Sequence, residues 1–210
     1  MGMLKIVVLI SGRGSNLKAI IDKCSKKNVP AKVIAIISNN STASGLKLNG
    51  KFKKIIINNK LSKKKFENEL QKNLKKLNPN LICLAGFMKI LSPFIINKWK
   101  NKIINVHPSL LPSFKGLNTH ERALNAGAKK SGCTIHFVDK SLDGGAIIAQ
   151  ASTVIKKKMT SKELSKKILK MEHKIYPEVI YLFAKKKINI KKNKVFIKDK
   201  RKLNYFIKSV

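Results

Sequence analysis

Two adjacent stretches near the start of the 210-residue chain decide the fold: KIVVLI at residues 5–10 and SGRGSN at residues 11–16. The first is a short β-branched apolar run, which is typical of a buried strand. The second contains two glycines that allow a tight turn, and beyond it Leu17, Ile20 and Ile21 recur at helical spacing. A strand, a glycine loop and a helix in this order predict the first unit of a parallel α/β sheet.

The same alternation continues along the chain. We expect further buried strands at residues 33–37, 54–57, 81–85 and 102–106, and helices at residues 62–77, with Ser62 as N-cap, and 94–99. Later segments predict a helix at 118–128, antiparallel strands at 134–138 and 147–154, a long helix at 161–183 interrupted at Pro177, and a hairpin at 188–197.

These elements predict an α/β, Rossmann-like fold: a mostly parallel twisted sheet with helices on both faces and a C-terminal antiparallel part. The length favours a single domain over residues 1–210. Within it we expect a phosphate-binding half at 1–100, a catalytic half at 101–185 and a basic C-terminal tail at 186–210.

Composition narrows the class of protein. The chain is 43% hydrophobic, yet no apolar run approaches the roughly 20 residues that cross a bilayer, and no leader is evident, so we expect a soluble cytoplasmic protein. The three cysteines show no CxxC spacing, which predicts free thiols rather than disulfides or a metal site. Cys133 lies between Gly132 and Thr134 near the motifs described below, and packing is favoured there over a nucleophilic role.

The formal charge of +36 would attract polyanions. Only three of the 46 basic residues are arginine, however, and specific readers of bases and phosphates favour the bidentate arginine fork. We therefore expect a solvated lysine surface and no specific nucleic-acid partner. A nonspecific polyanion-binding protein is the alternative from another class, and a steep loss of binding with salt would distinguish it.

Ligands of open parallel sheets bind beyond the carboxyl ends of the strands. The glycine loop offers backbone N–H groups and a helix N-terminus, which suits a phosphate, although a plain tight turn is the alternative. Asn105 and His107 end a strand two residues apart, so their side chains share one side and form a plausible oxyanion-binding pair. Asp143, in a Leu-Asp-Gly-Gly turn, would favour the imidazolium form of His107 if it lies nearby. We expect His120 near this site and His136 and His173 to be structural.

Four motifs in this order resemble the phosphoribosylglycinamide formyltransferases. They are ISGRGSN at residues 10–16, LAGFM at 84–88, NVHPSLLP at 105–112 and LDGG at 142–145. The resemblance covers nearly the whole chain. It implies 10-formyltetrahydrofolate as co-substrate, phosphoribosylglycinamide as formyl acceptor, a place in purine biosynthesis, and neither a metal nor a covalent intermediate.

The resemblance also implies a role for each matching position. The catalytic set is Asn105, His107 and Asp143; the substrate-binding set is Gly12, Arg13, Gly14, Ser15, Asn16, Pro108 and Glu172; and the folate-binding set is Lys63, Met88, Lys89, Ile90, Leu91 and Asn105. Lys63 and Lys89 stand where relatives commonly have arginine, so the charge is kept and the bidentate fork is lost. Lys115 and Asn118 stand where proline and histidine are frequent. A monomer or weak homodimer is expected.

Two related enzymes are alternatives. A methionyl-tRNA formyltransferase shares the His-Pro-Ser-Leu-Leu-Pro segment but needs a C-terminal domain of about 50 residues or more, and only about thirty residues follow the core here. A formyltetrahydrofolate hydrolase carries a regulatory domain before the glycine loop, which here begins almost at once.

Overall fold

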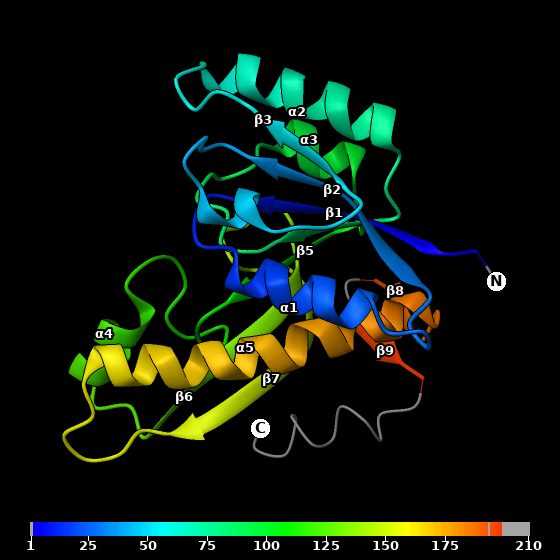
Figure 1. Ribbon diagram of the computed structural model, residues 1–210. Coiled ribbons are helices and arrows are strands. Elements are labelled where there is room, and N and C mark those ends of the chain that lie inside the picture. The colour runs from blue at the N-terminus through cyan, green and yellow to red at the C-terminus, as the bar shows by residue number, and fades with distance from the viewer. Residues whose placement is uncertain (1, 193, 199–210) are drawn as a thin grey trace. The chain divides into compact units, whose positions relative to one another are not determined.

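The computed structural model of the protein describes residues 2–192 and 194–198 (Figure 1). The chain divides into two compact units between Asn105 and Val106. Strand β5, Ile103–His107, contains both residues, so its first three residues end the first unit and its last two begin the second.

In the first unit, the strands lie in the order β3-β2-β1-β4-β5, and every neighbouring pair is parallel. The strands preceding β5 are β1 (Leu4–Ile10), β2 (Ala31–Ser38), β3 (Lys53–Ile56) and β4 (Leu81–Leu84). The helices are α1 (Ser15–Cys24), α2 (Lys63–Leu77) and α3 (Pro93–Lys98). Figure 1 draws α1 on one side of strands β1 and β2 and α2 and α3 on the other.

The apolar runs that predicted these strands form the core of the unit. The five residues from Ile6 to Ile10 are fully buried, as continuous apolar runs are in a sheet covered by helices. Ile10 pairs with Ser38 of β2, and Leu9 pairs with Leu84 of β4. The loops that follow these three strands therefore leave the sheet at the same edge.

Helix boundaries in this unit follow local chemistry. Ser62 is the N-cap of α2, as predicted, and its hydroxyl accepts a hydrogen bond from the Lys65 N–H at 3.4 Å. Pro93 opens α3, where its missing N–H costs nothing. The short 3-10 helix η1 (Ser44–Lys47) was not predicted, because four residues carry no periodic signal.

In the second unit, β6 (Lys130–Phe137) and β7 (Ile147–Val154) form the expected antiparallel pair. Helix α5 (Ser161–Ala184) packs on both strands, and α4 (Thr119–Asn125) contacts α5. The predicted hairpin at residues 188–197 is confirmed as β8 (Ile188–Lys191) and β9 (Lys194–Ile197). The remainder of the basic tail, residues 199–210, lies outside the described residues.

The predicted interruption of α5 at Pro177 is wrong. The helix runs through this position for 24 residues, after starting at a capping box between Thr160 and Glu163. Proline removes one backbone donor, but Pro177 and its neighbours Tyr176, Val179 and Ile180 are buried. Packing of this apolar face outweighs the roughly 3 kcal/mol that an interior proline costs.

The predicted fold class is confirmed: an α/β fold with parallel strands, covering helices and a C-terminal antiparallel part. Within residues 2–192 and 194–198, no helix is both long and apolar enough to cross a membrane.

Candidate active site

The glycine loop after β1 has a conformation that its residues require. Gly14 is the N-cap of α1 with φ of 74°, in the left-handed region that favours glycine. A Cβ on Gly14 would lie 2.5 Å from the Gly45 Cα in η1, and the Gly45 N–H donates to the Gly12 carbonyl at 3.1 Å. The loop is thus held closely against η1. It presents the N-terminus of a ten-residue helix, whose first turn carries no acid, at the sheet edge where ligands bind.

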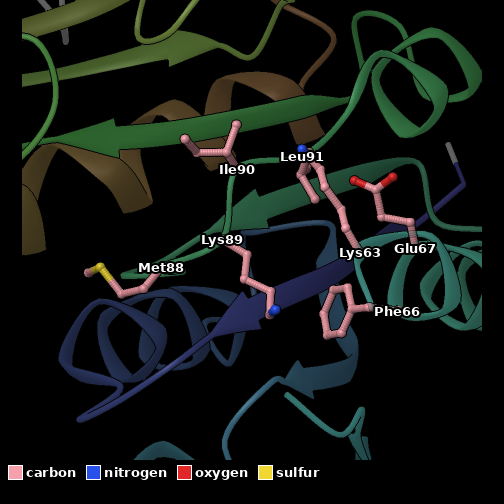
Figure 2. Close-up of a pocket in the computed structure, with 7 residues that line it drawn as sticks. All are labelled: Lys63, Phe66, Glu67, Met88, Lys89, Ile90 and Leu91. Carbon is pink, nitrogen blue, oxygen red and sulfur yellow. The ribbon is translucent and has the colours of Figure 1, made fainter. Parts of the chain in front are cut away.

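A pocket of about 340 Å³ lies in the same unit, between α2 and the loop after β4 (Figure 2). Its lining contains all five residues that the family resemblance assigns to folate from these two segments, Lys63 and Met88 to Leu91. Met88 and Ile90 are each 70% exposed, whereas Leu91 is buried. Exposed apolar side chains beside two lysines suit a ligand with a flat apolar part and an anionic end.

Phe66 and Glu67 also line the pocket, and they were not predicted as site residues. The Phe66 ring stacks on Phe87 with centroids 6.4 Å apart, and the Lys89 Nζ lies 4.7 Å from the Phe66 centroid. The buried Glu67 carboxylate accepts hydrogen bonds from the Ser92 N–H, at 2.7 Å, and from the Ser92 hydroxyl. Phe66 belongs to the apolar period of α2, whereas the burial of Glu67 on the same helix and the contacts of both residues are shown only by the fold.

His107 and Asp143 are brought together in the second unit. The His107 Nδ1 lies 3.4 Å from the Asp143 Oδ2, and both side chains are nearly buried. The His107 Nε2 lies 3.0 Å from the Phe114 carbonyl oxygen. Because a carboxylate and a carbonyl both accept hydrogen bonds, this arrangement suits a ring that carries hydrogens on both nitrogens. Asn105 precedes His107 by two residues on β5 and pairs with Leu84.

Asp143 has a second histidine neighbour, His136, which we predicted to be structural. Its Nε2 lies 3.8 Å from the Asp143 Oδ1, while its Nδ1 donates to the Phe137 carbonyl at 2.9 Å. Burial lowers the pKa of His136, so the ring is neutral at pH 7 and its one hydrogen is on Nδ1. The buried His136 ring on β6 therefore lies beside the Asp143 carboxylate, and its structural role stays a prediction.

The loop at residues 113–118 contacts both members of this pair through its backbone. The Gly116 N–H donates to the Asp143 Oδ2 at 2.9 Å. The Arg122 guanidinium of α4 donates to the Lys115 carbonyl at 2.6 Å and the Leu117 carbonyl at 3.3 Å, and it lies 5.8 Å from the Phe114 ring. Arg122 therefore supports a loop in which lysine replaces the family's usual proline.

The remaining predicted residues of this unit lie on neighbouring elements. The Pro108 carbonyl accepts from the Thr119 hydroxyl at 2.9 Å. Glu172 is buried on α5 and close to Cys133, whose pKa is raised by burial and by the Glu172 charge. Cys133 therefore stays a neutral thiol and is no nucleophile. Burial lowers the pKa of His120, and the charge of His107 lowers it further. This second effect indicates that His120 lies near His107.

Burial also lowers the pKa of His173 on α5. Among the described residues, no group of three or more histidine, cysteine, aspartate or glutamate side chains is arranged to hold a metal ion.

Comparisons with known proteins agree with this geometry. Residues 4–180 match the family model described as formyl transferase. The phosphoribosylglycinamide formyltransferase of Haemophilus influenzae is 40% identical over 205 residues, covering 94% of this chain and 95% of that protein. The solved structure of phosphoribosylglycinamide formyltransferase from Coxiella burnetii in complex with CHES has a TM-score of 0.88 and 42% identity, covering 93% of each chain.

A longer relative matches over part of its length. The trifunctional purine biosynthetic protein adenosine-3 of Bos taurus is 40% identical over 193 residues, which is 90% of this chain. The chain spans only 19% of that relative's length.

The α/β fold, the glycine loop and the histidine–carboxylate pair, matched over residues 4–180, define the class as a formyl transferase. The near full-length similarity then narrows the class, and the chain belongs to the phosphoribosylglycinamide formyltransferase family.

Proposed function

We propose that this protein transfers the formyl group of 10-formyltetrahydrofolate to the amine of 5′-phosphoribosylglycinamide. The observation that carries the proposal is the His107–Asp143 pair, in which both ring nitrogens face hydrogen-bond acceptors. With its Nδ1 hydrogen held by Asp143, the ring can turn its Nε2 hydrogen from the Phe114 carbonyl to an oxyanion, the charge that develops when an amine attacks a formyl carbon.

The reaction proceeds by direct transfer. The amine nitrogen of the acceptor forms a bond to the formyl carbon, and the carbonyl electron pair moves to oxygen to give a tetrahedral oxyanion. The Asn105 amide and the His107 imidazolium donate hydrogen bonds to this oxygen, each worth on the order of 3 kcal/mol. The attacking nitrogen then loses its proton and the departing folate nitrogen gains one. The oxyanion re-forms the carbonyl as the carbon–nitrogen bond to folate breaks, and the electron pair of that bond stays on the folate nitrogen.

Asp143 has two roles: it stabilises the charge of His107, and it helps to move the proton from the attacking nitrogen to the departing folate nitrogen. Its negative charge, 3.4 Å from the ring, attracts positive charge on His107, and we expect it to help move the proton between the two nitrogens with water as the carrier. Of the two histidine neighbours of Asp143, His107 is the nearer, at 3.4 Å against 3.8 Å for His136, whose Nδ1 donates to the Phe137 carbonyl.

The two substrates occupy different parts of the protein. The phosphate of the acceptor binds at Gly12, Arg13, Gly14, Ser15 and Asn16, where the helix dipole of α1 favours an anion, and Pro108 and the buried Glu172 contact the ribose part. The folate lies in the pocket of Lys63 and residues 88–91 and against Asn105. The two lysines attract its carboxylates.

A competition assay tests the proposal. The purified protein is given 10-formyltetrahydrofolate together with phosphoribosylglycinamide, initiator tRNA and water as acceptors, at low and moderate salt. We expect the formyl group to appear on phosphoribosylglycinamide at both salt concentrations. Transfer to tRNA, or hydrolysis alone, would refute the proposed acceptor.

A further inference from the structure

Ser11, at the start of the glycine loop, uses all of its polar groups to join neighbouring loops. Its N–H donates to the Gly86 carbonyl at 3.1 Å, and its carbonyl accepts from the Asn40 side chain at 3.2 Å. Its hydroxyl donates to the Asn39 Oδ1 at 2.6 Å and accepts from the Met88 N–H at 2.8 Å. One serine therefore connects the loops that follow β1, β2 and β4.

The direction of these hydrogen bonds is set by Asn39. This side chain is buried, and its amide nitrogen donates to the Asn59 Oδ1 at 3.4 Å, which leaves its oxygen facing Ser11. The Ser11 hydroxyl hydrogen is directed to that oxygen, so a lone pair remains for the Met88 N–H. Alanine at position 11 would leave the Met88 N–H without this acceptor.

The two ends of this connection belong to the two substrate sites. Ser11 directly precedes Gly12, the first residue of the proposed phosphate loop, and Met88 is the first residue of the pocket wall at residues 88–91. The opposite end of that wall is fixed separately, by Glu67 through Ser92. The Ser11 hydroxyl is therefore a direct contact through which the conformation of the phosphate loop can reach the wall of the folate pocket.

We propose that Ser11 is a positioning residue that couples the two substrates, so that filling the phosphate loop tightens binding in the folate pocket. The inference rests on the proposed function, because that function assigns the two ligands to these two segments. An occupied glycine loop restricts Ser11, Ser11 fixes the Met88 backbone, and the pocket wall is then ordered before folate binds. Coupling through one hydrogen bond is worth about fivefold in affinity, and by linkage each substrate must tighten the other by the same factor.

A binding cycle tests this coupling with a pair of ligands that cannot react. Tetrahydrofolate carries no formyl group, so its dissociation constant is measured by calorimetry without and with saturating phosphoribosylglycinamide. We expect the constant to fall about fivefold in the wild type and to stay within twofold in Ser11→Ala. Ser11→Thr, which keeps a hydroxyl, should recover the coupling.

Ser25→Ala is the matched control. It also removes one serine hydroxyl that makes one hydrogen bond, to the Ile21 carbonyl at 2.9 Å, but on the exposed end of α1. It should retain the wild-type ratio. A Ser11→Ala variant with the wild-type ratio, or a wild type whose two constants are equal, would overturn the inference.

The outcome is distinguishable from failure of the proposed function. If the wild type formylates phosphoribosylglycinamide but shows no coupling, only the role of Ser11 is wrong. If it formylates another acceptor, the competition assay refutes the function whatever the binding cycle gives.

Discussion

Replacing Asp143 with asparagine tests the charge of the catalytic pair with little change of shape. Asp143 has φ of 48°, a left-handed conformation that asparagine also tolerates, and an amide oxygen can still accept from the Gly116 N–H. The fold should therefore survive. What disappears is the negative charge beside His107.

The distance sets the size of the effect. At 3.4 Å and an effective dielectric constant of about 20, the attraction between a carboxylate and an imidazolium is about 5 kcal/mol. If slightly more than half of this attraction stabilises the transition state, the loss is about 2.7 kcal/mol, or about a hundredfold in rate. We expect kcat to fall by at least that factor in Asp143→Asn, and likewise in His107→Ala, which removes the oxyanion donor itself.

The assay is steady-state formyl transfer at saturating concentrations of both substrates, with circular dichroism to verify the fold. Asp139→Asn is the matched control, because it removes one carboxylate from the same loop, where Asp139 accepts from the Ser141 N–H and hydroxyl. It should retain kcat within about threefold. An Asp143→Asn enzyme that is folded and turns over within tenfold of the wild type would refute the charge argument.

Three further predictions follow from the geometry. Gly14→Ala should lower the free energy of unfolding by about 2 kcal/mol or more in urea titrations, because the alanine Cβ would lie 2.5 Å from the η1 backbone at a residue with positive φ. The same variant should raise the KM for phosphoribosylglycinamide, and an unchanged KM would argue against a phosphate site in this loop. Glu67→Ala should raise the KM for the folate about tenfold and leave kcat within threefold, because Ser92 loses its acceptor; Glu69→Ala on the same helix should change neither. Burial lowers the pKa of His136 in the folded protein, so as the pH falls below about 6.5 the unfolded chain binds a proton at this histidine before the folded chain does, and stability is lost. His136→Gln should therefore lose less unfolding free energy than the wild type between pH 7 and pH 5. An equal loss in both proteins would contradict this.

Local chemistry was sufficient to predict most elements of the fold. The buried runs at residues 5–10 and 81–85, and the serine that caps α2, depend on neighbours in sequence, so the strands and the cap were confirmed within a few residues. Pro177 shows where this reasoning fails. A helix propensity describes an isolated helix. The buried face of α5 is stabilised by packing on β6 and β7, and the residues next to Pro177 in the sequence carry no information about that packing.

The candidate site divides in the same way. Spacing alone could pair Asn105 with His107, because both lie on one strand with a period of two. It could not place Asp143, which is 36 residues beyond His107 in the chain, although the family motifs suggested it. The 3.4 Å contact exists because the turn that follows β6 brings Asp143 back to His107, the last residue of β5. The same turn meets the loop that Arg122 holds.

The sequence by itself determined the type and order of most elements, the glycine loop, the place of Asn105 and His107 on one strand and, through its motifs, the family. These features follow from the periodicity of side chains and from backbone restrictions that act over a few residues. Only the tertiary structure decided that His136 adjoins Asp143, that Phe66 and Glu67 line the pocket beside Lys63 and residues 88–91, and that Ser11 joins three loops. Each of these contacts links residues far apart in the chain, and packing and hydrogen bonding between elements, rather than local preference, bring such residues together.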